Sequence, residues 1–109
     1  MIPGMANRSS LTVAIDIDGT WTLDPQLFDD IANMFQEEGW TVIIVTGREQ
    51  PKEKITQLGL YGWPIIVSGE LLKQDAALKA GYNVNVWIDN EPGTIQQCKI
   101  LTGELDDQS

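Results

Sequence analysis

The stretch VAIDIDGTW, residues 13–21, decides the fold because an apolar run ends there on two aspartates. The run begins at residue 11, and its β-branched members favour a buried strand. In an extended chain, alternate residues point to the same side. We therefore expect Asp16 and Asp18 to face one small volume, where each carboxylate raises the pKa of the other unless a cation neutralises them.

Further apolar runs follow at residues 41–45, 64–67 and 84–88, and amphipathic segments separate them. This alternation predicts an α/β protein with a parallel sheet and helical crossovers. Capping residues and helical spacing of apolar residues predict the helices. They are expected over 24–39, 51–59 and 70–80, with a fourth that opens at Pro92 and carries Cys98.

Length and composition bound the organisation of the chain. Its 109 residues predict one domain, over 11–103, between flexible tails at 1–10 and 104–109. A lone cysteine, Cys98, excludes an intramolecular disulfide. No apolar span approaches the length of a transmembrane helix, and the first residues lack the apolar core of a secretory signal. We therefore expect a cytoplasmic protein with no membrane partner.

The formal net charge of -9 and the absence of histidine limit the possible functions. An acidic chain disfavours tight non-specific binding to nucleic acid, because such binding needs cations that neutralise phosphates. A chain without histidine cannot form a Ser-His-Asp triad or an imidazole zinc site. We expect a small ligand or a metal cation as partner, with carboxylates supplying any acid–base chemistry.

A polar residue follows each predicted strand, namely Asp16, Thr46, Ser68 and Asp89. Open α/β sheets bind ligands at the carboxyl ends of their strands, so we expect these side chains to lie together. Mg²⁺ relieves repulsion between acids most simply, because it takes oxygen ligands including one or two carboxylates. The turn after the first strand adds backbone N–H groups that can cradle an anion, those of Ile17, Gly19 and Thr20.

These motifs resemble those of the haloacid dehalogenase superfamily of phosphatases, in the same order and over about residues 11–101. VAIDIDGTWTL (13–23) is similar to the first motif, a strand followed by DxDGT, and VIIVTGR (42–48) is similar to the second. Lys73 resembles the family's lysine in placement, and VWIDNEPG (86–93) resembles the acidic fourth motif. The resemblance implies a three-layer α/β/α sandwich with a doubly wound, Rossmann-like parallel sheet and no cap domain.

The resemblance also implies a Mg²⁺-dependent hydrolase of phosphomonoesters. It makes Asp16 the nucleophile that forms an aspartyl-phosphate, and Asp18 the general acid and then the base. It implies that Mg²⁺ is held by Asp16, the Asp18 carbonyl and Asp89, with Asn90 as a further candidate. Thr46 and Lys73 would take part in catalysis by binding the phosphoryl group. The residues implied or expected to contact phosphate or substrate are Ile17, Gly19, Thr20, Thr46, Gly47, Arg48 and Lys73.

The chain departs from the family pattern at two points. Asn90 stands where a second acid is common, and Glu91 follows it, so the metal site carries less charge. The gaps between motifs also leave no room for a cap domain. We therefore expect an open pocket that admits bulky substrates or is covered by a second copy of the chain in a homo-oligomer.

Several of these residues also have a purely structural interpretation. The D-x-D-G run is compatible with an ordinary strand-to-turn transition, and Thr46 with a strand end. Lys79 is an alternative to Lys73 as the phosphate-binding lysine. Trp21 suits core packing or a pocket wall. A group of cations beyond the second strand suits either a solvated face or a substrate clamp: Arg48, Lys52 and Lys54.

Two functions other than hydrolysis stay open. The first is a catalytically weak or inactive module that binds a metal or a partner, and Asn90 supports it. The second is a receiver-like domain whose aspartate accepts phosphate. The position of Asp16 and Asp18 on the first strand argues against the receiver, whose acid pair is adjacent and whose phosphoacceptor lies on a later strand. Dinucleotide binding is disfavoured because no G-x-G-x-x-G follows the first strand.

Overall fold

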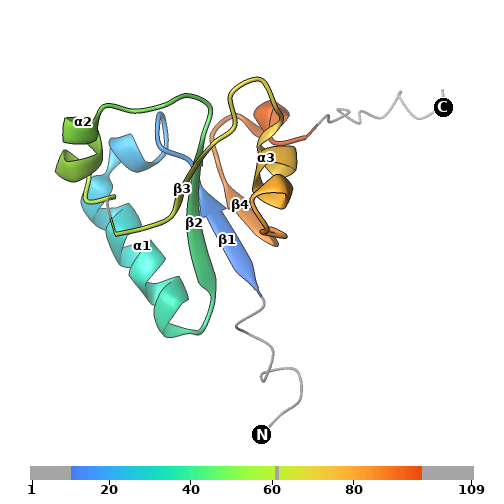
Figure 1. The fold of residues 1–109 in the computed structure, drawn as a ribbon. Helices are drawn as coiled ribbons and strands as arrows, with labels where there is room; N and C mark the ends of the chain where they lie inside the picture. Colours follow the sequence, from blue (N-terminus) through green and yellow to red (C-terminus); the bar gives the residue numbers. More distant parts are fainter. Residues whose placement is uncertain (1–10, 61, 97–109) are drawn as a thin grey trace, which may run out of the picture.

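The structure is a computed structural model that describes residues 11–60 and 62–96. It contains a four-stranded parallel sheet with helices (Figure 1). The predicted tails, the end of the domain at residue 103 and Cys98 lie outside the described residues. Of the predicted fourth helix, the described part is a 3-10 helix, η3, over Pro92–Thr94.

The sheet places the first strand next to the last. Its strands are β1 (Thr12–Ile15), β2 (Thr41–Thr46), β3 (Ile65–Val67) and β4 (Val86–Ile88), in the order β3-β2-β1-β4. All neighbouring pairs are parallel. The chain moves outward from β1 to β3 and then returns to the other side of β1. The strand order therefore reverses between β1 and β4, the position at which open α/β sheets form their ligand crevice.

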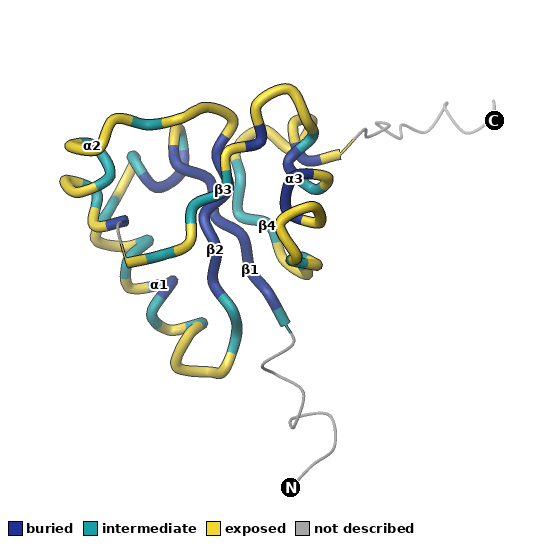
Figure 2. Tube along the Cα trace, viewed as in Figure 1, coloured by how far each residue is buried: buried dark blue, intermediate teal, exposed yellow. Residues whose placement is uncertain are grey.

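Helices cover both faces of the sheet, and β1 is buried throughout (Figures 1 and 2). Side chains alternate between the two faces along each strand. One core cluster joins Val13 and Ile15 to α1 (Pro25–Glu37) and to Ile55 of α2 (Lys52–Gln57). The other joins Ala14 to Ala77 of α3 (Lys73–Lys79). Burial on both faces explains why the two central strands, β1 and β2, read as continuous apolar runs.

The helix boundaries follow the capping residues. The side chain of Asp24 accepts a hydrogen bond from the Leu27 N–H at 3.2 Å, and Pro25 occupies the first turn of α1. Gly39 then adopts a φ of 94°, which ends the helix as expected. Within the described ranges, no helix has both the length and the apolar character that crossing a bilayer requires.

The short 3-10 helix η2 (Trp21–Leu23) buries Trp21 completely. The indole Nε1 donates to the Leu58 carbonyl at 2.9 Å, so the one polar atom of the ring has a partner inside the protein. Trp21 also packs at 6.2 Å from the Phe28 ring. Of its two interpretations, the core interpretation is therefore correct.

Candidate active site

The residues that follow the strands gather at the carboxyl edge of the sheet. Asp16, Thr46 and Ser68 line one open pocket of about 440 Å³, together with Lys73. Asp89 joins them through its contact with Lys73. The pocket lies at the point where the strand order reverses, so the topology accounts for its position.

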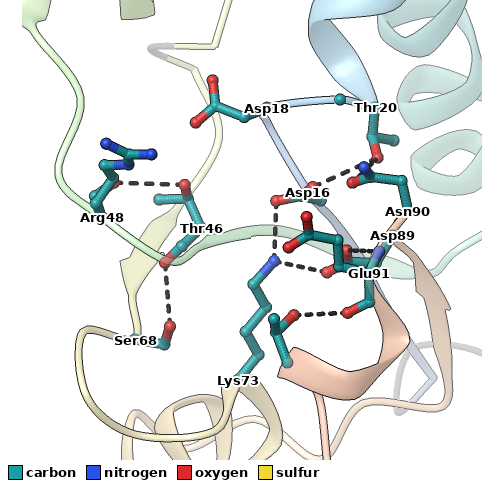
Figure 3. Close-up of polar contacts among 12 residues, drawn as sticks. Asp16, Asp18, Thr20, Thr46, Arg48, Ser68, Lys73, Asp89, Asn90 and Glu91 are labelled. Carbon is teal, nitrogen blue, oxygen red and sulfur yellow. Dashed lines mark hydrogen bonds and ion pairs between the residues drawn. The ribbon is translucent and has the colours of Figure 1, made fainter.

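Lys73 is the centre of this cluster (Figure 3). As the first residue of α3, it extends its Nζ to Oδ1 of Asp16 at 2.9 Å and to Oδ2 of Asp89 at 2.6 Å. The side chains of Lys73, Asp16 and Asp89 are only 6%, 7% and 1% exposed. Lys79 is exposed at the other end of α3. The lysine that reaches the pocket is therefore Lys73.

Burial and neighbouring charges shift the pKa values of Asp16 and Lys73 to different extents. Burial raises the pKa of Asp16, because the hydrogen bond and charge of Lys73 only partly offset it and Asp89 adds repulsion. Burial alone would lower the pKa of Lys73, but hydrogen bonds from Nζ to Asp89 and Asp16 outweigh it and raise that pKa. The ammonium of Lys73 thus contacts two carboxylates. These contacts keep Lys73 charged, but they offset only part of the effect of burial on the pKa of Asp16.

Asp18 does not behave as the sequence predicted. Its carboxylate receives Lys54 Nζ at 2.6 Å and Gln50 Nε2 at 3.0 Å, and its side chain is 48% exposed. The hydrogen bond from Lys54 lowers the pKa of Asp18. The mutual rise in pKa that was expected in the absence of a cation is therefore not seen, because a different lysine neutralises each of the two acids. The strand ends at Ile15, so Asp18 lies in a turn rather than in extended chain, and the acid that opposes Asp16 is Asp89.

Asn90 joins the two halves of the D-x-D motif. With its amide nitrogen turned toward them, Asn90 donates to Oδ2 of Asp16 at 3.0 Å and to the Asp18 carbonyl at 3.2 Å. Gly19 makes room for this amide. A Cβ on Gly19 would lie 2.5 Å from the Asn90 side chain, and its φ of 82° is itself unfavourable for other residues. The turn after β1 is therefore built around the Asn90 side chain.

The oxygen atoms around the Asn90 amide suit Mg²⁺ as ligands. Asp16 Oδ2 and the Asp18 carbonyl converge on a single polar group, and half a rotation of the Asn90 amide would place a third oxygen there. Mg²⁺ prefers such oxygen ligands and needs only one or two carboxylates. Asp89 instead faces Lys73 and the Glu91 N–H, at 2.8 Å. Among the described residues, no three acidic, histidine or cysteine side chains form a metal-binding group.

The backbone cradle expected in the turn is already occupied. The Ile17 N–H bonds to the Asp16 carboxylate, and the Gly19 N–H donates to Thr22 Oγ1 at 3.0 Å. The Thr20 N–H donates to the Ile17 carbonyl at 3.2 Å, and the Thr20 hydroxyl lies 3.5 Å from Asp16 Oδ2. The turn therefore uses these donors itself, and an anion on the three N–H groups stays a prediction.

Side chains on the β2 side of the pocket supply other contacts. Thr46 is buried, with its hydroxyl 3.4 Å from the Arg48 carbonyl, and Gly47 and Arg48 line the pocket. Within the described part of the chain, the Arg48 guanidinium has no hydrogen bond or ion pair, so it can meet a ligand. Lys54 is engaged by Asp18, and Lys52 is exposed on α2 away from this pocket.

Sequence reasoning missed several residues that contact the site residues or line the pocket. Gln50 donates to Asp18 and lies 3.4 Å from Thr46 Oγ1, yet it is a polar loop residue with no periodic pattern around it. Its proximity to Thr46 along the chain was the only available signal. Leu71 and Leu72 form an apolar wall before α3, and they resembled ordinary members of a helical stripe.

Comparisons of the chain with protein-family models, with curated proteins and with solved structures found no match. The function therefore has to be inferred from the contacts of the site residues. The contacts that distinguish this pocket are a buried lysine between two aspartates and an amide that joins both halves of the D-x-D motif.

Proposed function

We propose that this protein hydrolyses phosphomonoesters through a phosphorylated aspartate, as its resemblance to the haloacid dehalogenase phosphatases implies. The observation that carries the proposal is Asp16, a buried carboxylate that lines an open pocket with one oxygen against Lys73. A carboxylate nucleophile needs a cation beside it that also attracts the phosphoryl oxygens, and Lys73 meets both needs.

The phosphoryl group would lie among Lys73, Thr46 and Arg48. Phosphoryl transfer spreads negative charge over the equatorial oxygens, so positioning and cationic stabilisation supply most of the catalysis. Lys73 supplies a fixed positive charge from the start of α3. Arg48 lines the same pocket, its guanidinium has no ion-pair partner among the described residues, and it suits bidentate contact with an anion.

The reaction would proceed in two displacements. A carboxylate oxygen of Asp16 attacks phosphorus while the bond from phosphorus to the ester oxygen breaks, and the departing oxygen takes a proton from Asp18. Water then attacks the phosphorus of the aspartyl-phosphate, gives its proton to Asp18, and the bond between phosphorus and Asp16 breaks. Inorganic phosphate leaves, and both carboxyl groups return to their starting states.

The contacts of Asp18 favour the second displacement over the first. Lys54 lowers the pKa of Asp18, which keeps its carboxylate ionised and able to accept a proton from water, although it also makes the carboxylate a weaker base. The same contact disfavours the protonated form that donates to a leaving group. Esters whose leaving group is a weak base, such as aryl phosphates, should therefore react faster than alkyl phosphates.

The metal would be held by Asp16 Oδ2, the Asp18 carbonyl and the Asn90 amide oxygen, with Asp89 as the family ligand that faces Lys73 in this structure. When bound, Mg²⁺ supplies positive charge that offsets the charge on the phosphoryl oxygens. The chain's own residues orient Asp16: Lys73 holds its Oδ1, and the Asn90 amide nitrogen holds its Oδ2 in the orientation without the metal.

The fold type, the cellular location and the substrate class are proposed from the sequence. We take the fold as a doubly wound three-layer sandwich of the small capless type, acting in the cytoplasm on a small phosphorylated molecule. The open pocket supports the absence of a cap domain, because none of the lining residues in the described part of the chain belongs to a covering element. A second copy of the chain could exclude water in place of a cap domain.

The decisive experiment measures hydrolysis of p-nitrophenyl phosphate with and without Mg²⁺. We expect Mg²⁺-dependent turnover that Asp16→Asn lowers by about a thousandfold or more, because the variant lacks the nucleophile. Asp75→Asn removes an exposed acid of α3 and is the matched control. An Asp16→Asn variant as active as the wild type would overturn the proposal.

A second candidate is an inactive module on the same scaffold. The engagement of Asp18 by Lys54 favours it, because the proposed acid is held in its ionised form. Mg²⁺ binding without hydrolysis of any phosphomonoester would select this function. Stable labelling of Asp16 by acetyl phosphate would instead select a receiver-like phosphoacceptor.

A further inference from the structure

The exposed side of α1 carries large apolar side chains. Leu27 and Met34 are 47% and 63% exposed, and Ile31 between them is half-buried. Residues spaced i, i+4 and i+7 form one row on a helix. We call this row, Leu27, Ile31 and Met34, the α1 ridge.

A groove runs beside the α1 ridge, and side chains that pack on the core form its base. It encloses about 210 Å³ and is lined by Ile31 and Met34 with Phe35, Glu38 and Trp40. The Phe35 and Trp40 rings meet edge to face with centroids 5.0 Å apart, and both rings pack on the main core cluster. The groove is therefore formed before any partner arrives, which reduces the entropic cost of binding.

Charge on α1 has a single sign. Asp30 and Glu37 are both exposed and lie seven residues apart, so they form a row next to the α1 ridge. The helix contains no lysine or arginine over its full length. The face thus combines an apolar ridge with an acidic flank, a pattern that attracts a cationic amphipathic partner.

We propose that the α1 ridge docks an amphipathic helix of a partner protein. That helix would place apolar side chains in the groove and lysine or arginine beside Asp30 and Glu37. The acidic flank selects this occupant. It repels nucleic acid and anionic membranes, and two copies of this chain would bring their own acidic rows face to face.

Binding can be tested on the full chain with a labelled synthetic helix of about 18 residues, five turns, that carries leucines on one face and lysines along its flank. Fluorescence anisotropy should show saturable binding. The double variant Leu27→Gln, Met34→Gln should weaken it by about tenfold or more. Leu78→Gln is the matched control, because Leu78 is 50% exposed on α3 and lies outside the ridge.

A second experiment tests the contribution of the acidic residues of α1 to binding. Raising the salt concentration from about 50 to about 500 mM should weaken binding markedly, because salt screens the attraction between the acidic side chains and the lysines of the peptide. The variant Asp30→Asn, Glu37→Gln should weaken binding and reduce its salt dependence. Asp75→Asn, Glu53→Gln removes the same charge from other exposed positions and should have little effect.

Several results would overturn the proposal. They are the absence of saturable binding, an equal loss of binding in Leu78→Gln, equal binding of a peptide with glutamate in place of lysine, and a dimer that the ridge variant abolishes. Circular dichroism of each variant establishes that it folds. Because every readout is binding, failure here leaves the phosphatase proposal unaffected.

Discussion

Lys73 donates to Oδ1 of Asp16 at 2.9 Å, although 57 positions separate the two residues in the sequence. The contact joins the start of α3 to the end of β1, so regular secondary structure holds both partners in place. A buried ammonium is tolerated only while its acids are present, and the acids are tolerated only while the ammonium is. The contact therefore bears on stability as well as on chemistry.

Lys73→Met should destabilise the fold at pH 7. It leaves Asp16 and Asp89 buried without their cation, and breaking a buried ion pair from one side typically costs about 3–5 kcal/mol. Urea unfolding at pH 7 measures the loss in the free energy of unfolding. The loss should shrink as the pH falls and the carboxylates become neutral, and the raised pKa of Asp16 brings this change to a higher pH than for an ordinary aspartate.

Lys79→Met is the control for that prediction. Lys79 lies on the same helix and is exposed, so its replacement should change the free energy of unfolding by less than about 0.5 kcal/mol. Equal effects of the two substitutions would show that the buried position of Lys73 adds nothing to stability.

Gly19→Ala should disturb the site more than its backbone strain alone explains. A Cβ at Gly19 meets the Asn90 side chain at 2.5 Å, whereas one at Gly59 meets nothing within 4 Å. Both glycines have positive φ, 82° and 73°, so Gly59→Ala carries the strain of about 1 kcal/mol without the collision. Urea unfolding of both variants should give the larger loss for Gly19→Ala. Equal losses would mean that Asn90 moves aside freely.

Asn90→Asp should couple stability to Mg²⁺. In EDTA the new carboxylate faces Oδ2 of Asp16 and lowers the melting temperature through repulsion. Added Mg²⁺ should then stabilise the variant by about 1.4 kcal/mol once free Mg²⁺ exceeds its Kd tenfold, and should stabilise the wild type less. Glu91→Gln is the comparison, because Glu91 lines the pocket without contacting the D-x-D motif. A Mg²⁺ response that needs Glu91 and ignores residue 90 would move the metal to Glu91.

Lys54→Met should flatten part of the pH dependence of stability. The hydrogen bond from Lys54 lowers the pKa of Asp18 below 3.8, so the pair stabilises the fold above that pH and loses this contribution as the pH falls through the lowered pKa. The two side chains are 34% and 48% exposed, which limits the effect at pH 7 to about 1 kcal/mol. Chemical unfolding at pH 7 and at low pH measures both ends of this range. Lys52→Met, an exposed neighbour, should match the wild type at both.

Much of the fold could be predicted because its signals are local. The apolar runs mark β1 to β4, and Asp24, Pro25 and Gly39 bound α1. The gathering of strand-end residues followed from the geometry of parallel sheets alone, without any knowledge of individual contacts. The same geometry brought Asp89 beside Asp16, although these residues lie far apart in the chain.

What escaped prediction depends on where a side chain points once the strand has ended. Alternation of faces holds for Ile15 but not for Asp18, because the chain turns after β1. The turn also uses the N–H groups of Gly19 and Thr20 for its own hydrogen bonds. Gln50 and Lys54 reach Asp18 across the pocket edge, and no pattern in their own segment reveals a target.

The position of β4 has a dynamic consequence. This strand has three residues, Val86–Ile88, and within the described sheet it pairs with β1 alone. Asp89 follows it directly, and the Asp16 amide donates to the Ile88 carbonyl at 3.0 Å. A brief local unfolding of this margin would carry Asp89 away from Lys73 while β2 and β3 stay paired. Local unfolding of β4 would thus leave Lys73 without one of its two carboxylate partners while the rest of the protein is still folded.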